Sequence, residues 1–116
     1  MALPWWFPFG RVPEIAPEAL EARLKKKPWP QVVDVRTPTE FAAGHVRGAV
    51  NAPVTALRSR LGALNLDPGR PVVAVCLTAH RSIPAVRLLR QQGFDAVQLA
   101  GGMRAWRAAR LPEARR

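Results

Sequence analysis

The chain has 116 residues, which suits one domain with a single core and is too short for two. Its single cysteine excludes an internal disulfide and a cysteine-based metal cluster. The formal net charge is +10, but the arginines are scattered and only Lys25-Lys26-Lys27 and the C-terminal tail are locally dense, so we expect a solvated basic surface and no nucleic-acid partner.

The hydropathy of the sequence and its N-terminal residues indicate the expected cellular location of the protein. Its longest uncharged apolar stretch is far shorter than the roughly 20 residues that span a bilayer. The N-terminus lacks a basic region followed by an apolar run and a small-residue cleavage site. We therefore expect a cytoplasmic protein with no stable membrane insertion, in a compartment that keeps its thiol reduced. We expect no metal and no cofactor.

The first half of the chain alternates helical and strand-like patterns. Residues 17–27 predict a helix, because Pro17 suits a first turn and apolar side chains recur at i and i+4. A short buried strand is predicted at 32–35. It is followed by a capped helix at 37–44, a short strand at 49–52 and a short helix at 55–61.

The second half continues the alternation after a turn at 66–69. Strands are predicted at 72–75 and 96–99, with helices at 82–92 and 103–109. Met103 and Trp106 fall on one face of the last helix and are predicted to be core residues. Strands separated by helices predict an α/β fold with a parallel sheet, whose ligands bind at the carboxyl ends of the strands.

Cys76 stands at such a carboxyl end, between the strand 72–75 and the helix that begins at Ser82. Backbone N–H groups of the loop and the positive end of the helix dipole favour the thiolate form there. We expect a largely ionised nucleophile at neutral pH. The alternative is a small buried apolar residue, because free cysteine is among the most buried residue types.

An aromatic, proline-rich segment, Leu3-Pro4-Trp5-Trp6-Phe7-Pro8-Phe9, lies in an N-terminal arm that we assign to residues 1–12. Its prolines exclude a regular helix. We expect the arm to pack on its own domain; the alternatives are a contact with a partner, a second copy or a membrane surface.

Three separated motifs resemble those of the rhodanese-like domain family. They are D-V-R-x-x-x-E-F-x-x-G-H-V-x-G-A-x-N at 34–51, C-x-x-x-x-R-S at 76–82 and G-F-x-x-V-x-L-x-G-G-x-x-x-W at 93–106. The resemblance implies a single rhodanese-like domain, which we place at 13–110 before a basic tail at 111–116. It also implies a central parallel sheet of about five strands, flanked by helices on both faces.

The same resemblance implies a thiosulfate sulfurtransferase in which Cys76 carries a persulfide. The expected partners are a small anionic sulfur donor, such as thiosulfate, and an acceptor that is a thiol, a protein sulfur acceptor or cyanide. The substrate-binding residues are then those of the loop, Leu77, Thr78, Ala79, His80, Arg81 and Ser82.

Residues of the first motif are expected to support this loop. We favour structural roles for Asp34, Arg36, Glu40 and His45, with an Arg36–Glu40 ion pair across one helical turn. Arg81 either orients an anion or ties the loop to a carboxylate such as Asp34 or Glu40.

Two features of the loop depart from the family's pattern. Ala79 stands where the family often has glycine, and a left-handed backbone there costs alanine on the order of 1 to 2 kcal/mol. Leu77 replaces a polar or cationic residue that some thiosulfate-using relatives carry, so the identity of the donor stays open.

Two other functions fit the same fold. Phosphatases and arsenate reductases of this fold have five residues between the cysteine and the arginine, whereas only four, Leu77 to His80, separate Cys76 from Arg81. A non-enzymatic sulfur carrier or interaction module is the third class. Sulfur transfer is the interpretation that we favour.

Overall fold

The strands form one parallel sheet with five members. The computed structural model describes residues 5–6 and 10–115 and places the strands in the order β1-β5-β4-β2-β3. All neighbouring strands run parallel. The α/β fold expected from the sequence is confirmed. The strands are β1 (Glu14–Ile15), β2 (Gln31–Asp34), β3 (Val50–Asn51), β4 (Val72–Val75) and β5 (Ala96–Leu99).

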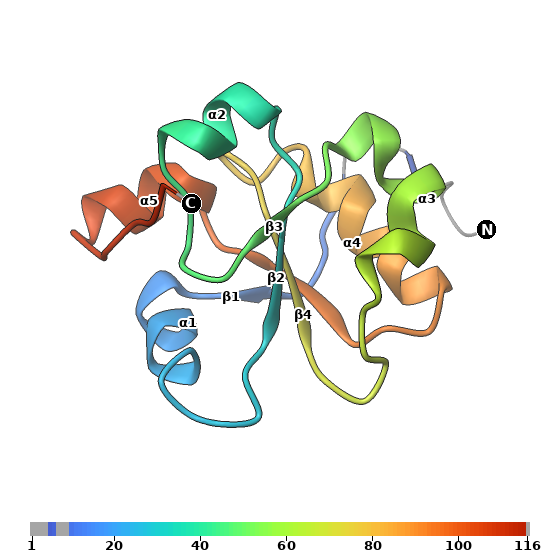
Figure 1. The fold of residues 1–116 in the computed structure, drawn as a ribbon, viewed down its shortest axis with the longest axis horizontal. Coiled ribbons are helices and arrows are strands. Elements are labelled where there is room, and N and C mark those ends of the chain that lie inside the picture. The colour runs from blue at the N-terminus through green and yellow to red at the C-terminus, as the bar shows by residue number, and fades with distance from the viewer. Residues whose placement is uncertain (1–4, 7–9, 116) are drawn as a thin grey trace.

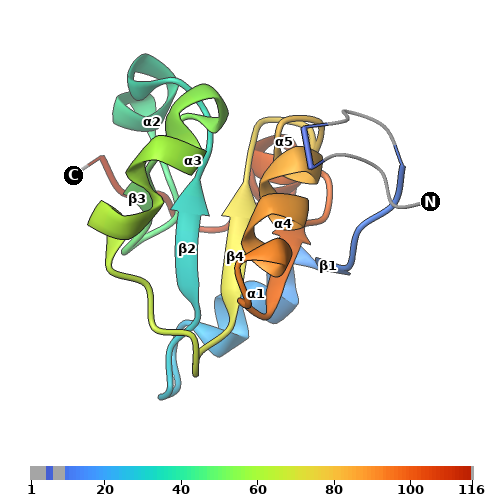
Figure 2. The ribbon, with the colours of Figure 1, turned by 90° about the vertical axis from the view of Figure 1, so that its right-hand side faces the viewer.

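Helices cover both faces of this sheet (Figure 1). One face carries α1 (Pro17–Arg23) and α5 (Gly102–Ala108). The other carries α4 (Ser82–Gln91) and α3 (Leu57–Arg60), and 3-10 turns flank α3 at Val54–Ala56 and Leu61–Leu64. The short helix α2 (Pro38–Ala43) lies at the carboxyl end of β2 (Figure 2).

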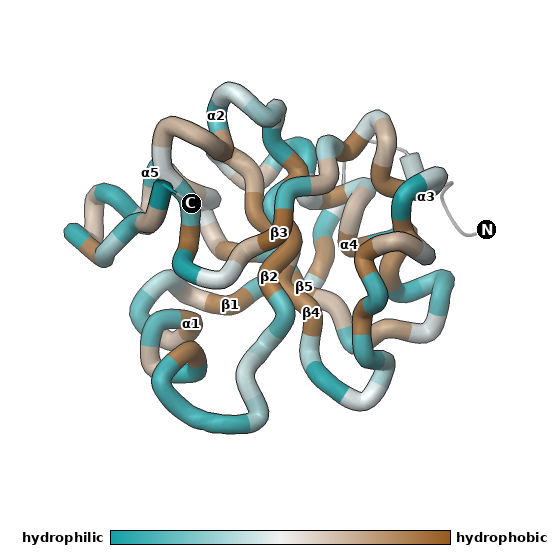
Figure 3. Tube along the Cα trace, in the orientation of Figure 1, coloured by the Kyte–Doolittle hydropathy of each residue, from teal (hydrophilic) through white to brown (hydrophobic). Residues whose placement is uncertain are grey.

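The central strand β4 divides its side chains between two apolar clusters. Val72 and Ala74 pack in the cluster under α3 and α4, whereas Val73 and Val75 pack in the cluster under α1 and α5. The hydrophobic colour of the trace is accordingly concentrated on the strands (Figure 3). Side chains alternate along a strand. Cys76 therefore faces α4, on the same side as Ala74, and belongs to that cluster.

Some elements differ from the sequence prediction. The strand β1 was not predicted, because two residues are too few to show an alternating pattern; it is held by its register with β5, which pairs Glu14 with Gln98. The first helix ends at Arg23 and not at residue 27, and the lysines follow it in a turn. The helix expected at 55–61 is a single α turn between two 3-10 turns.

Both ends of the described chain contact the domain. Trp5 packs against the cluster under α4, and together with Trp6, Val54, Thr55 and Pro84 it lines a cavity of about 210 Å³. Trp6 is 61% exposed. The other residues of the aromatic segment, Leu3, Pro4 and 7–9, lie outside the described residues.

The C-terminal tail packs against the apolar cluster under α1 and α5, to which Leu111 contributes. Ala114 exchanges two backbone hydrogen bonds with His45, of 2.7 and 2.8 Å, and the indole of Trp106 donates to Pro112 O at 2.9 Å. Trp106 and Met103 are fully buried, so the prediction that both are core residues is confirmed. Within residues 5–6 and 10–115, no helix is long and apolar enough to cross a bilayer.

Candidate active site

Cys76 lies directly after β4, at the carboxyl end of the central strand, and the loop 77–81 connects it to the first turn of α4. The cysteine residue is 1% exposed, whereas His80 is exposed and its loop neighbours are half-buried. The thiol is therefore buried at the base of the loop.

Helix α5 holds the loop in place from the other face of the sheet. The N–H groups of Met103 and Arg104 donate to the carbonyl oxygens of Cys76 and Leu77 at 2.8 and 2.9 Å. This approach requires glycine at position 102, where φ is +62° and a Cβ would overlap both carbonyl groups. Gly102 thus allows α5 to lie against the cysteine loop.

Ala79 adopts the left-handed backbone that glycine favours. Its φ is +69°, while Arg81 two residues later is in an ordinary right-handed conformation with φ −68°. A left-handed residue within a turn redirects the successive N–H groups, and such turns make concave sites that bind anions. The loop therefore keeps this shape although it has a side chain at position 79.

The sulfur of Cys76 contacts the hydroxyl of Ser82 at 3.5 Å. Ser82 Oγ in turn donates to Gln98 Oε1 at 2.6 Å, and Gln98 Nε2 donates to Glu14 Oε2 at 3.1 Å. Ser82 is fully buried and Gln98 is 6% exposed. Gln98 and Glu14 were not among the residues expected from the sequence; the signal for Gln98 is a polar residue in the apolar strand Ala96–Leu99.

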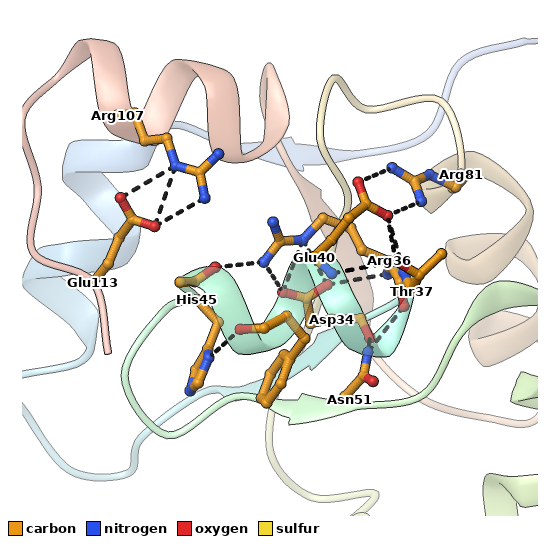
Figure 4. A network of polar contacts seen from close by, with 11 residues as sticks. Asp34, Arg36, Thr37, Glu40, His45, Asn51, Arg81, Arg107 and Glu113 are labelled. Carbon is orange, nitrogen blue, oxygen red and sulfur yellow. Dashed lines mark hydrogen bonds and ion pairs between the residues drawn. The ribbon is translucent and has the colours of Figure 1, made fainter. Parts of the chain in front are cut away.

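Arg81 forms a bidentate ion pair with Glu40 (Figure 4). Its two terminal nitrogens donate to the two carboxylate oxygens at 2.6 and 2.9 Å. These bonds, together with the hydrogen bonds that Glu40 accepts from Thr37, lower the pKa of Glu40 from 4.5 to about 2, and the contact with Glu40 raises the pKa of Arg81. Glu40 also closes the capping box of α2 with Thr37. The contact ties the cysteine loop to α2, with Glu40 as the partner.

Asp34 and Arg36 form a second ion pair, which is buried at the end of β2. Arg36 Nη2 lies 2.7 Å from Asp34 Oδ2 and donates to Gly44 O at 2.7 Å, and Asn51 Nδ2 donates to Arg36 O at 2.9 Å. The predicted Arg36–Glu40 pair is wrong, because the chain bends after β2 and the carboxylate of Asp34 accepts hydrogen bonds from both the backbone N–H and the side chain of Arg36.

The two histidines lie in different environments. His45 is buried, stacked on Phe41 with ring centroids 3.7 Å apart, and its Nδ1 is 2.8 Å from Phe41 O. His80 is exposed on the loop, and its Nδ1 is 2.9 Å from Thr78 Oγ1. His45 is thus a structural residue, whereas His80 stands at the surface of the loop above Cys76.

The structure brings the loop residues, Ser82 and Glu40 together around the carboxyl end of β4, with the Asp34–Arg36 pair beside them at the carboxyl end of β2. Among the residues that the structure describes, no group of three or more His, Cys, Asp or Glu is arranged to hold a metal ion. The chemistry that these side chains offer is that of a thiol next to a loop of N–H donors.

The parallel sheet and the loop between β4 and α4 define an α/β domain with a buried cysteine at the carboxyl end of its central strand. The family described as Rhodanese-like domain matches residues 16–109. The chain is 38% identical over 95 residues to the thiosulfate sulfurtransferase GlpE of Pseudomonas aeruginosa (strain LESB58). The matched region is 81% of this chain and 83% of that protein. The chain belongs to the rhodanese-like sulfurtransferase family.

Two further relatives differ in length from one another. It is 42% identical over 83 residues, 70% of its length, to the HTH-type transcriptional regulator Rv0324 of Mycobacterium tuberculosis, of which it spans 36%. A rhodanese-related protein from Thermoplasma volcanium superposes with a TM-score of 0.81 at 27% identity, over 90% of this chain and all of that one. The rhodanese-like domain thus occurs in relatives both of this size and considerably longer.

Proposed function

We propose that this protein is a thiosulfate sulfurtransferase that moves sulfane sulfur through a persulfide on Cys76. The observation that carries the proposal is the placement of the chain's single cysteine at the carboxyl end of β4, under a loop that ends at the N-terminus of α4. The similarity to GlpE supports thiosulfate as the donor.

The transfer takes place in two displacement steps. The thiolate of Cys76 attacks the outer sulfur of thiosulfate, a new S–S bond forms, and sulfite leaves with the electron pair of the bond that breaks. The thiolate of the acceptor, or cyanide, then attacks the outer sulfur of the persulfide. Cys76 leaves as a thiolate, and the acceptor carries the sulfur away.

The loop stabilises the anions that occur in both steps. The thiolate and the persulfide each carry a negative charge, which the N–H groups of residues 77–82 and the dipole of α4 stabilise without a general base. The left-handed backbone at Ala79 gives the loop the turn that such a cradle requires. The Arg81–Glu40 pair keeps the loop in this shape.

The length of the loop distinguishes this proposal from phosphate chemistry. Four residues separate Cys76 from Arg81, and both terminal nitrogens of Arg81 are bonded to Glu40. We expect sulfur transfer from thiosulfate to cyanide to exceed the hydrolysis of an aryl phosphate by orders of magnitude, and efficient phosphatase activity would reverse the assignment.

Intact-mass spectrometry tests the covalent step. After incubation with thiosulfate, the protein should gain the mass of one sulfur atom, and cyanide should remove it again. Cys76→Ser should abolish both the gain and the turnover while the melting temperature stays near that of the wild type, because a hydroxyl of similar size is not ionised at neutral pH. Turnover by the serine variant, or a stable persulfide that no acceptor discharges, contradicts the proposal; the second outcome identifies a sulfur carrier.

A further inference from the structure

Four polar side chains form a continuous line across the face of the sheet that α4 covers. Glu14 of β1 and Gln98 of β5 are register partners, and Gln98 is in turn the partner of Ala74 on β4, two residues before Cys76. Since side chains two apart point to the same face, Glu14, Gln98 and Cys76 share a face. Ser82, in the first turn of α4, joins Gln98 to Cys76.

The carboxylate of Glu14, at the outer end of the line, fixes the direction of each hydrogen bond. A carboxylate only accepts hydrogen bonds, so the amide nitrogen of Gln98 faces Glu14 and its oxygen faces Ser82. Ser82 has one hydroxyl proton, which it donates to that oxygen at 2.6 Å. The side of Ser82 Oγ toward the sulfur, 3.5 Å away, therefore presents a lone pair.

We propose that Glu14 and Gln98 are positioning residues that turn the hydroxyl proton of Ser82 away from Cys76. In this arrangement Ser82 accepts a hydrogen bond from the protonated thiol and has no proton for the thiolate. To donate to the thiolate, Ser82 must turn its proton away from Gln98 Oε1, or Gln98 must turn this oxygen toward Glu14. The first change leaves the amide oxygen without a donor, and the second places it against a carboxylate that cannot donate. The inference rests on the proposed role of Cys76 as the nucleophile.

Other charges around the sulfur stay constant when this line is altered. They come from the loop, from α2, from the end of β2 and from the start of α5, and they are His80, Arg81, Glu40, Asp34, Arg36 and Arg104. Arg81 is one cation within electrostatic range of Cys76. A change at Glu14 alters none of their contacts, so its effect on Cys76 passes through Gln98 and Ser82 or directly through space.

Alkylation of Cys76 by iodoacetamide, followed against pH, tests the proposal. The chain has one cysteine, so the rate reports this thiol alone. Glu14→Gln lets Gln98 reverse, since a glutamine at position 14 both donates and accepts. We expect the midpoint of the pH profile to fall by about one to two pH units, the scale of one hydrogen bond to a charged sulfur.

Two controls separate the hydrogen-bonded line from a general effect of charge. Glu18→Gln removes the same charge from the start of α1 and should move the midpoint far less. In a Ser82→Ala background, Glu14→Gln should move nothing, because the link to the sulfur is gone. An unmoved midpoint in the single variant, or equal shifts with and without Ser82, overturns the proposal.

The test is independent of sulfur transfer. Alkylation needs neither donor nor acceptor, so a shifted midpoint in a protein that forms no persulfide supports the line and refutes the proposed function. Persulfide formation with identical pH profiles for the wild type and Glu14→Gln does the reverse. Melting temperatures of the wild type and the four variants identify any variant whose profile changes because it unfolds.

Discussion

The left-handed backbone at Ala79 makes a measurable prediction about stability. With φ at +69°, the Cβ of alanine approaches the following carbonyl oxygen, which costs on the order of 1 to 2 kcal/mol. Glycine removes this cost and at the same time raises the entropy of the unfolded chain, which costs roughly 0.4 to 1 kcal/mol. Ala79→Gly should therefore increase the free energy of unfolding by about 0.5 to 1 kcal/mol.

Thermal melts of Ala79→Gly and a matched variant measure this difference. A gain of that size raises the melting temperature of a domain of this length by about 2 to 5 °C. Ala56 is half-buried like Ala79 but has φ −112°, so Ala56→Gly carries only the entropic cost and should melt below the wild type. We expect the rate of persulfide formation to stay unchanged, because the strain is the same in the thiolate and the persulfide states. A glycine variant at 79 that melts as low as Ala56→Gly refutes the strained loop.

Three further predictions concern the contacts that hold the loop. The pKa of Glu40 is lowered from 4.5 to about 2, so its pair with Arg81 stabilises the protein above pH 4.5 and is lost as the pH falls toward 2. Glu40→Gln should lower the free energy of unfolding by about 1 kcal/mol at neutral pH, where solvent screens the pair, and by little near pH 2. Urea titrations at the two pH values measure this difference. Arg36→Leu leaves Asp34 buried without its cation and should cost about 3 to 5 kcal/mol in the same assay, while the double variant Asp34→Leu/Arg36→Leu costs much less. Gly102→Ala should lower the melting temperature far more than Gly48→Ala, because both positions have positive φ but only at 102 does a Cβ meet the carbonyl groups of the cysteine loop.

The parts of the site that the sequence predicts are those that depend on neighbours in the chain. The strand 72–75, the cysteine after it and the helix start at Ser82 form one continuous segment, and each part has a local signal: an apolar run, a polar loop and a helical pattern. The left-handed backbone at Ala79 also belongs to this local segment. The sequence pointed to it because alanine stands where related loops often have glycine, and φ is +69° there.

The parts that could not be predicted depend on pairing between distant strands. Glu14 and Gln98 are 84 positions apart and meet only because β1 lies beside β5 in register. The Arg36–Glu40 prediction failed for a related reason, since it applied helical spacing to a residue that precedes the helix. Arg36 lies at the bend after β2, where the carboxylate of Asp34 accepts hydrogen bonds from its backbone N–H and its guanidinium. Glu40 is left to pair with Arg81 from the other half of the sequence.

The contacts of the two arginines bear on how an anionic donor is recognised. Arg81 places both terminal nitrogens on Glu40, and Arg36 is buried against Asp34 and Gly44 O. Each guanidinium is therefore engaged in holding the loop and the end of β2. In the proposed function, attraction of the anionic donor then falls to the N–H groups of the loop at short range and to the net charge of +10 at long range, which raises the rate of encounter. Long-range attraction is screened by salt, whereas hydrogen bonds within the loop are much less so. The apparent affinity for thiosulfate should accordingly weaken as ionic strength rises, while the rate of the covalent step at saturating donor stays constant.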